Sequence, residues 1–310
     1  MAARYILTLF QTGRDFIDRK MVDKLQIGLS KITSKPEDTE IDIWIDSPGG
    51  SAHAAYKLWL ELRSRANKLR AWVPDYAKSA ATLLVLGMDE IYMGKGAELG
   101  PLDAQIEHPD RERTYISALD LVGALDYFSS FAVQLAITGG AAMVKYTQLP
   151  RTDILCEILP FAAKLIEPCV NKIDPTLTRR AVSQLQVAEH YARRMLAERN
   201  VPKDLRFSEE DAEKLTSKLV KEYPVHECVI GRQEAKALGL PIYEAEKDKL
   251  WPKVNAVYRN FSEVCVPQKK SLLGIVPFND IVKNNAMRTI EQKPMNKKKG
   301  KKTKVKKGQR

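Results

Sequence analysis

IDIWIDSPGGS (Ile41–Ser51) decides the fold, because it joins an apolar strand to a helix through two adjacent glycines. Three alternating isoleucines predict a short strand, Ser-Pro-Gly-Gly ends it, and helical spacing follows over residues 51–66. At the start of a helix, the backbone N–H groups of Gly49 and Gly50 are free of side-chain obstruction, and the helix dipole favours negative charge there. This turn therefore predicts an oxyanion-binding site.

A second unit of the same layout follows about thirty residues later, in WVPDYAKSAATLLVLG (Trp72–Gly87). A strand over residues 69–73 and a turn over residues 74–77 precede Ser79, which begins an apolar helix over residues 80–87. One interpretation makes Ser79 a helix N-cap, the commonest use of serine at this place. The other makes it a nucleophile, because the N–H groups of Ala80 and of Gly49 or Gly50 are placed to hold a developing oxyanion.

Three ordered segments carry a resemblance to a known family. SPGGS (47–51), YAKSAATLLVLGMDEIYMG (76–94) and AELGPLDAQ (97–105) resemble the serine dehydrogenase proteinase family, with a weaker echo at residues 226–240. That family is similar to signal peptide peptidase A and, more remotely, to the Clp proteolytic subunit. The resemblance implies an α/β fold of the Clp/crotonase type, a superhelix of repeated ββα units with added helices. It also implies an oligomeric serine peptidase whose nucleophile is Ser79 and whose oxyanion hole is formed by Gly49, Gly50 and Ala80.

The general base is harder to place from this resemblance. Clp-type enzymes carry a histidine about twenty-five residues after the serine, where this chain has AELGPLDAQ, and His108 lies beyond it in a polar loop. Signal peptide peptidase A relatives carry a lysine forty to fifty residues after the serine, but no lysine stands between Lys95 and Lys145. Neither family spacing is therefore met directly.

An insertion restores a lysine to the expected place. Residues 115–168 read as extra helices, and Lys172 then precedes a helix over residues 176–199, as the family's lysine does. A lysine serves as a base when burial or positive charge lowers its pKa, and Asp174 opposes that effect. Lys172 is the first choice, a surface lysine is the alternative, and the rival bases are Lys145, Lys164 and His226.

Lys78 directly precedes Ser79 but is not expected to be its base. Adjacent residues on a helix point about 100° apart and do not face each other. We expect Lys78 to hold an anionic group or to pair with Asp75.

Length and composition fit a folded domain with helical additions, as the resemblance to a peptidase family implies. The chain has 310 residues, is 44% hydrophobic and is expected to form one domain over residues 1–265, with a helical insertion at about 115–168 and an extension over 266–292. MAARYILTLF is too short for a secretory signal and no apolar run is expected to reach the length of a membrane span, so we expect a cytoplasmic protein. The apolar helix over residues 116–144 is expected to be a buried or oligomer-forming hairpin, with a lid or membrane-skimming surface as the alternative.

No cofactor or metal site is expected. The four cysteines, which lack CxxC pairing, predict buried reduced thiols: Cys156, Cys169, Cys228 and Cys265. The chain also has no P-loop and no GxGxxG motif, which argues against nucleotide chemistry.

The net charge of +11 is concentrated at one end. Residues 293–310 hold nine lysines, one arginine and no acid, so the first 292 residues carry only about +1. This segment is expected to be a disordered Lys-rich tail that either binds nucleic acid or an anionic membrane nonspecifically or serves solubility alone.

Besides a serine peptidase acting on a peptide or protein substrate, two other functions stay open. The first is a catalytically inactive oligomeric scaffold or adaptor of the same fold. The second is an acyl-CoA enzyme of the crotonase kind, in which the same oxyanion geometry would hold a thioester enolate.

Overall fold

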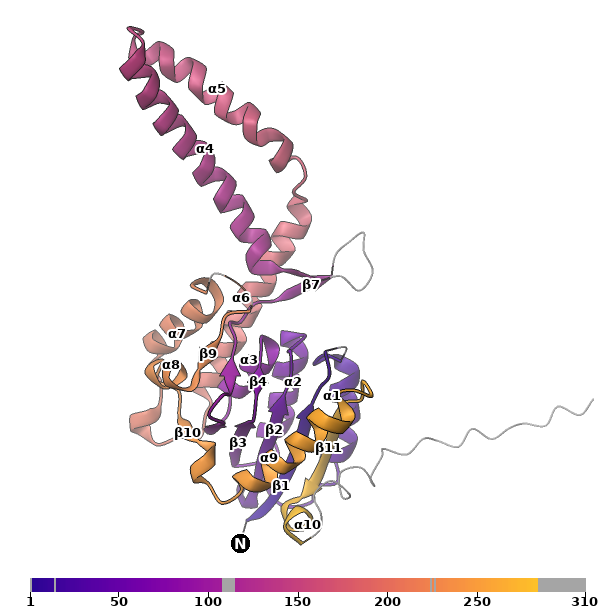
Figure 1. The fold of residues 1–310 in the computed structure, drawn as a ribbon. Coiled ribbons are helices and arrows are strands. Elements are labelled where there is room, and N and C mark those ends of the chain that lie inside the picture. The colour runs from indigo at the N-terminus through magenta and orange to yellow at the C-terminus, as the bar shows by residue number, and fades with distance from the viewer. Residues whose placement is uncertain (1, 14, 108–114, 224, 226, 284–310) are drawn as a thin grey trace, which may run out of the picture.

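The computed structural model describes residues 2–13, 15–107, 115–223, 225 and 227–283. At its centre is a six-stranded sheet (Figure 1). Its strands, in spatial order, are β10 (Ile242–Glu244), β5 (Glu90–Met93), β3 (Lys68–Val73), β2 (Thr39–Asp46), β1 (Ala3–Phe10) and β11 (Leu272–Pro277). All neighbours are parallel except β11, which pairs antiparallel with β1.

Alternate residues of these strands serve two separate cores, as the period of two requires. On one face Leu7 and Leu9 of β1 pack with the helices α1 (Arg19–Leu29), α2 (Ala52–Arg63) and α3 (Ala80–Leu86). On the other face Ile6 and Phe10 pack with α9 (Trp251–Asn260) and the π-helical turn Phe261–Cys265 that continues it. Because both faces are covered, β2 is buried along nearly its whole length.

Two helices leave this body as a long hairpin, formed by α4 (Ala118–Tyr146) and α5 (Arg151–Val170) (Figure 1). The chain returns through α6 (Pro175–Ala197), which packs against α2 and α3, and continues into α7 (Glu209–Lys221) and α8 (Arg232–Ala237). The remaining elements are short: β4 (Tyr76–Ala77), β6 (Glu98–Leu99), β7 (Gln105–Glu107), β8 (Tyr115–Ser117), β9 (Ile230–Gly231) and α10 (Phe278–Lys283). Of these, β4, β6 and β9 form a small sheet next to the start of α3.

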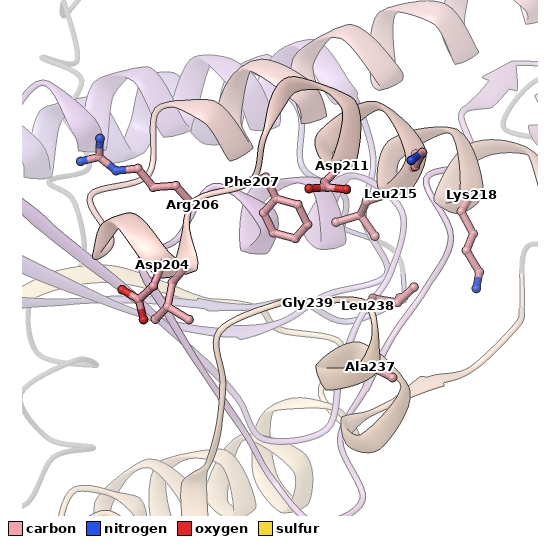
Figure 2. A pocket seen from close by; sticks show the side chains of 11 residues that line it. Asp204, Arg206, Phe207, Asp211, Leu215, Lys218, Ala237, Leu238 and Gly239 are labelled. Atoms are coloured by element: carbon pink, nitrogen blue, oxygen red, sulfur yellow. The ribbon is translucent and has the colours of Figure 1, made fainter.

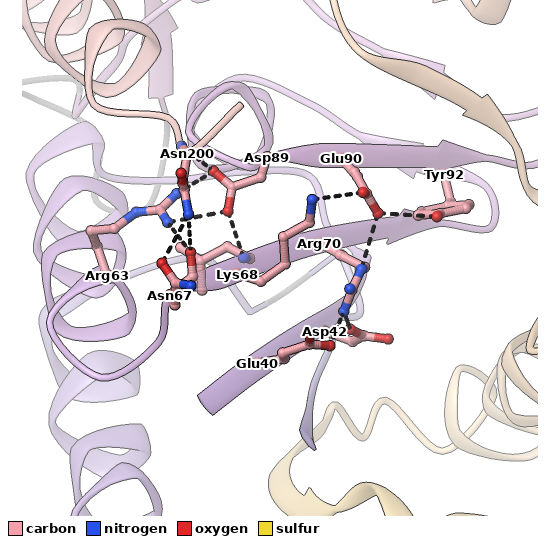
Figure 3. Close-up of polar contacts among 11 residues, drawn as sticks. Glu40, Asp42, Arg63, Asn67, Lys68, Arg70, Asp89, Glu90, Tyr92 and Asn200 are labelled. Atoms are coloured by element: carbon pink, nitrogen blue, oxygen red, sulfur yellow. Dashed lines mark hydrogen bonds and ion pairs between the residues drawn. The ribbon is translucent and has the colours of Figure 1, made fainter. Parts of the chain in front are cut away.

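The buried carboxylate of Asp89 joins three segments of the chain (Figure 3). Asp89 accepts hydrogen bonds from the guanidinium of Arg63 at 2.6 Å, from the backbone N–H of Leu69 at 2.8 Å and from that of Asn200 at 2.6 Å. The end of α2, the start of β3 and the segment after α6 are thereby tied to one side chain.

A second polar cluster crosses the middle strands (Figure 3). Arg70 on β3 pairs with Glu40 at 2.7 Å, with Glu90 at 3.0 Å and with Asp42 at 3.3 Å. Asp42 is fully buried, and this burial raises its pKa, although the neighbouring Arg4 and Arg70 oppose the rise. Charged groups on adjacent strands thus help to fix the register of β2 against β3.

The α/β class predicted from the sequence is confirmed, whereas the repeat of ββα units is not. Helices α1 and α2 separate β1, β2 and β3, so these strands follow one another as β–α–β units. Residues 272–277, which were expected to lie in an extension, form an edge strand of the main sheet. The Lys-rich segment over residues 293–310 lies outside the described residues.

Two expectations about surfaces were wrong. Cys156 and Cys169 are exposed, Cys228 is half-buried and only Cys265 is buried, because the first two lie on the projecting α5. By length and composition α4 is also able to cross a membrane, since it has 29 residues, and its most apolar 18-residue window has a mean hydropathy of 1.4 and is 0% buried. The two aspartates interrupt only its first part, which is why the expectation failed.

Candidate active site

Ser79 stands at the N-cap position of α3 but does not cap it. Its backbone has φ 50° and ψ −119°, a conformation that is strained for a residue with a side chain. Its Oγ makes no capping bond and instead donates to the backbone carbonyl of Asp103 at 2.6 Å. The N-cap interpretation of this serine is therefore not supported, and its buried hydroxyl sits on a strained backbone.

The two predicted turns meet backbone to backbone at this point. Gly49 has φ +102°, and a Cβ placed on it would lie 2.5 Å from the carbonyl oxygen of Lys78 and 2.9 Å from Cβ of Ser79. Gly50 has φ +144°, and a Cβ there would lie 2.5 Å from the carbonyl oxygen of Ile17. Both positions require glycine, because positive φ and this close approach exclude a side chain. The spacing of the glycines and the serine is thus a packing requirement.

The three predicted oxyanion donors are not equivalent. The N–H of Gly49 donates to Oγ of Ser47 at 3.1 Å, so it is not a free donor, which corrects the prediction for this residue. The N–H of Ala80 opens α3, and those of Ala80 and Gly50 donate in none of the hydrogen bonds of the described residues. Among the described residues, two unpaired backbone N–H groups therefore belong to residues that line the pocket at Ser79.

A narrow pocket of about 10 Å³ lies against Ser79. Its lining is almost entirely small or aliphatic, and consists of Gly50, Ala52, Ser79, Ala80, Leu83, Leu102, Asp103, Ala104 and Ala188. A much larger pocket of about 540 Å³ lies between α7 and α8, with Asp211 and Lys218 on one side and Gly239 on the other (Figure 2). None of the predicted catalytic residues lines it, so we place the candidate site at Ser79 in spite of the difference in size.

Lys78 faces away from Ser79, as its position in the sequence predicted. Its Nζ pairs with Glu98 at 2.8 Å and donates to the carbonyls of Leu99 at 3.3 Å and Cys228 at 3.2 Å. The expected pair with Asp75 is not formed; Asp75 instead accepts from the hydroxyl of Tyr258 at 2.8 Å. Lys78 therefore fastens the start of α3 to the small sheet.

The structure does not bring Lys172 to Ser79. Lys172 is exposed in the turn between α5 and α6, and Ala188, which lines the pocket, lies 13 residues beyond the first residue of α6. At 1.5 Å per residue that separation is about 20 Å, which exceeds the reach of a lysine side chain. Lys145 and Lys164 lie on the exposed hairpin, while His108 and His226 lie outside the described residues.

His53, which the sequence did not single out, lies next to the candidate site in the chain but does not line its pocket. Its Nδ1 lies 2.9 Å from the hydroxyl of Tyr191, so the side chain joins the start of α2 to α6. The residue before it, Ala52, lines the Ser79 pocket, as does Ala188, one helical turn before Tyr191. The sequence did place His53 at the start of the helix that follows Gly50. It did not show which residues surround this histidine, so it gave no reason to assign it a role.

A buried acid also adjoins the first turn. Burial raises the pKa of Asp46 to about 8; the backbone N–H of Tyr76, which donates to it at 3.3 Å, opposes this rise, and the charge of Asp75 adds to it. Asp46 ends β2 and directly precedes Ser47, the acceptor for the Gly49 N–H. The sequence shows this acid only as the last residue of an apolar strand.

Comparison with known proteins confirms the resemblance for one part of the chain. Residues 16–115 match the family of ClpP-like SDH-type serine proteinases. Uncharacterized protein MJ1495 of Methanocaldococcus jannaschii is 42% identical over 78 residues, and uncharacterized protein MJ0137 of the same organism is 40% identical over 78 residues. In both cases the match covers 25% of this chain and 27% of the relative, so the chain spans about a quarter of the length of these relatives.

Among solved structures, a serine-to-alanine mutant of the 1510-N membrane-bound stomatin-specific protease is similar over 50% of this chain and 68% of that chain. The sequence identity is 16% and the TM-score is 0.30.

Proposed function

We propose that this chain is a serine peptidase whose catalytic centre lies within the segment that matches the ClpP-like serine proteinases. The observation that supports this proposal most directly is the backbone of Ser79. A serine that only capped a helix would have no reason to adopt φ 50°, yet here the hydroxyl is left uncommitted to capping. A strained turn at the start of a helix is one way in which proteins hold a nucleophile beside backbone N–H donors.

In the proposed reaction Oγ of Ser79 attacks the scissile carbonyl carbon while its proton passes to a general base. The carbonyl oxygen becomes negative and is held by the N–H groups of Ala80 and Gly50. The base then protonates the leaving amine, and water hydrolyses the acyl-enzyme by the same steps. The small residues around the pocket favour peptides with a small side chain next to the scissile bond.

The hydroxyl of Ser79 must turn away from the carbonyl of Asp103 before it can react, because a peptide carbonyl is not a base. The lysine implied by the family resemblance, with Lys172 as first choice, acts only if the start of α6 moves toward α3. His53 is a further candidate, because it directly follows Ala52, which lines the pocket, and contacts Tyr191 on α6. We therefore propose that the base is found among Lys172, His53 and the rivals Lys145, Lys164 and His226.

Reaction with a fluorophosphonate probe tests the nucleophile. Wild-type protein should be labelled and should hydrolyse casein, whereas Ser79→Ala should lose both activities. Ser64→Ala is the matched control, because Ser64 also lies at a helix end and is remote in sequence from the two turns. If wild type is not labelled, or if Ser79→Ala still hydrolyses casein, the peptidase proposal fails and the inactive scaffold or the acyl-CoA enzyme takes its place.

Single alanine variants of the five candidate bases identify the proton acceptor. The base variant should lose as much turnover as Ser79→Ala, since the members of a catalytic unit fail together. The partners, the localisation and the binding by the Lys-rich tail stay predictions from the sequence.

A further inference from the structure

One wall of the pocket at Ser79 is a short segment without regular secondary structure. Leu102, Asp103 and Ala104 form this wall, and we call these three residues the strap. Most of the other lining residues belong to α2, α3 and α6. The pocket has a volume of about 10 Å³ and therefore holds no more than about one water molecule. A peptide reaches Ser79 only if part of the lining moves, and the strap is the longest part that no helix contains.

The strap also engages the hydroxyl of Ser79. Oγ of Ser79 donates to the carbonyl of Asp103 at 2.6 Å, and the two residues are only 4% and 1% exposed. A hydroxyl that donates its proton to a carbonyl does not offer that proton to a general base. The strap thus narrows the pocket and keeps the hydroxyl in an unreactive orientation.

Hydrogen bonds fasten the strap to α7 on one side and to α4 on the other. The N–H of Leu102 donates to the carbonyl of Leu219 at 2.8 Å, near the end of α7. The first N–H of α4 donates to the carbonyl of Ala104 at 2.8 Å, and the second, that of Leu119, donates to Oδ1 of Asp103 at 3.0 Å. The carboxylate that holds the start of α4 and the carbonyl that holds Ser79 therefore belong to the same residue.

The two attachments of the strap differ in how firmly they are packed. Leu219 is 1% exposed and lies in the main core. Ala118 is the only fully buried residue of α4, all of which the structure describes, and the rest of this helix leaves the body in the hairpin (Figure 1). Because elements with few buried contacts open most easily, the strap should come loose first at the start of α4.

We propose that the strap keeps the Ser79 site closed in the resting protein and that a displacement of the start of α4 opens it. When the bond between Leu119 and Asp103 breaks, the strap withdraws, the pocket widens and the hydroxyl of Ser79 turns to its base. The hairpin thereby regulates the catalytic centre from which it projects. This inference rests on the proposed function of Ser79.

The rate of labelling by a fluorophosphonate probe tests the proposal on the full chain. Leu119→Pro removes the N–H that holds Asp103, in the first turn, where a helix tolerates proline. Asp103→Ala removes the acceptor of the same bond. At low probe concentration both variants should be labelled at least about tenfold faster than wild type, the factor that corresponds to one hydrogen bond to a carboxylate. Asp103→Asn keeps an acceptor oxygen and should be labelled at the wild-type rate.

The dependence on probe concentration separates access to the site from its reactivity. If opening precedes binding, Leu119→Pro and Asp103→Ala should reach half-maximal labelling at a lower concentration, by the same factor, and keep the maximal rate within about twofold. Glu210→Pro is the matched control, because exposed Glu210 holds the same second position in α7, far along that helix from Leu219. Its labelling should stay at the wild-type rate.

The role of the hairpin is tested by a variant that leaves the strap intact. Leu121 lies in the first turn of α4 and packs half-buried against the main core. Leu121→Ala should loosen the start of α4 and speed labelling about threefold or more. Ile137→Ala is its control, because Ile137 is 62% exposed on the projecting part of α4, and it should have no effect.

Three results overturn the inference and leave the nucleophile in place, provided that circular dichroism shows folded variants. They are equal labelling of wild type, Leu119→Pro and Asp103→Ala, slower labelling of both variants, and a change in the maximal rate alone. Absence of labelling in every protein would instead end the proposed function, and this inference with it.

Discussion

The surroundings of Ser79 and the α4–α5 hairpin differ in how closely they are packed. Around Ser79, two turns from different units pack so closely that Gly49 and Gly50 have no room for a Cβ. On the hairpin, Gly123 has no atom within 4 Å of the place where a Cβ would stand, and large apolar side chains face outward. The first region is determined by contacts within the chain, whereas the second leaves much of its surface for contacts outside it.

This difference explains where similarity to known proteins lies. The match to the ClpP-like serine proteinases covers residues 16–115 and stops before α4 begins. Close backbone packing restricts which residues each position accepts, so a sequence motif in such a region is recognisable. A solvent-facing hairpin tolerates many sequences. The hairpin is therefore where this chain is free to differ.

Adding a methyl group to a glycine separates the two regions most strongly. Gly50→Ala should lower the free energy of unfolding by about 2–6 kcal/mol, because overpacking against Ile17 and strain at φ +144° each contribute about 1–3 kcal/mol. Gly123→Ala should raise it by about 0.5–1 kcal/mol, since alanine is the better helix former. Urea unfolding followed by circular dichroism measures both, and equal effects would erase the distinction.

Removing side-chain atoms from a leucine should distinguish the same two regions. Leu84 on α3 is 0% exposed, so Leu84→Ala should lower the free energy of unfolding by about 2–5 kcal/mol. Leu155 on α5 is 52% exposed, so Leu155→Ala should change it by about 0.5 kcal/mol or less. A large loss for Leu155→Ala in the same unfolding assay would mean that the hairpin has an inner core of its own.

The buried acid next to the first turn makes stability depend on pH. Folded Asp46, with its pKa of about 8, keeps its proton between pH 4 and 8, whereas the unfolded chain loses it near the ordinary value of 3.8. The folded state then binds more protons, so the free energy of unfolding falls as pH rises, by at most about 1.4 kcal/mol per unit.

Asp46→Asn removes this dependence. The variant should be more stable than wild type by a few kcal/mol at pH 8 and by little at pH 4. Thermal unfolding over this range measures the difference. Asp38→Asn is the control, because Asp38 is exposed, and its curve should stay parallel to that of wild type. A constant offset for Asp46→Asn would show that Asp46 does not hold its proton.

The smallest expected effect on the free energy of unfolding concerns the strain at Ser79. Ser79→Gly should abolish turnover, because the nucleophile is removed, and should raise the free energy of unfolding by about 1 kcal/mol, because glycine accepts φ 50° without strain. Ser79→Ala keeps the strained backbone and serves as the reference for stability. Equal stability of the two variants would mean that the conformation costs the chain nothing.

The sequence predicted the elements around the candidate site well. The strand at residues 41–45, the helix after Ser51 and the start of a helix at Ala80 all appear where apolar spacing and turn residues indicated them. These signals are local, and the structure confirms them. The side-by-side placement of the two turns followed from the family resemblance, and the backbone contact of Gly49 with Ser79 is its physical form.

What the sequence did not reveal depends on contacts between distant segments. The hydroxyl of Ser47, which accepts from the N–H of Gly49, donates to Gln11, 36 residues away. The pair of His53 with Tyr191 joins residues 138 positions apart. The exposure of Cys156 followed from the direction in which α5 leaves the body, which no local pattern encodes. Lys172 was chosen by its spacing along the chain, and the length of α6 carries that spacing away from Ser79.

The pairing of β11 with β1 has a consequence for the order in which the protein is made. Strand β1 is synthesised long before β11, so one of its edges stays bare until Leu272–Pro277 arrive. An unpaired apolar strand edge is a template for aggregation, and contacts between segments so far apart form slowly. Until β11 is made, the nascent chain therefore exposes an edge of β1, and we expect aggregation during synthesis to begin there.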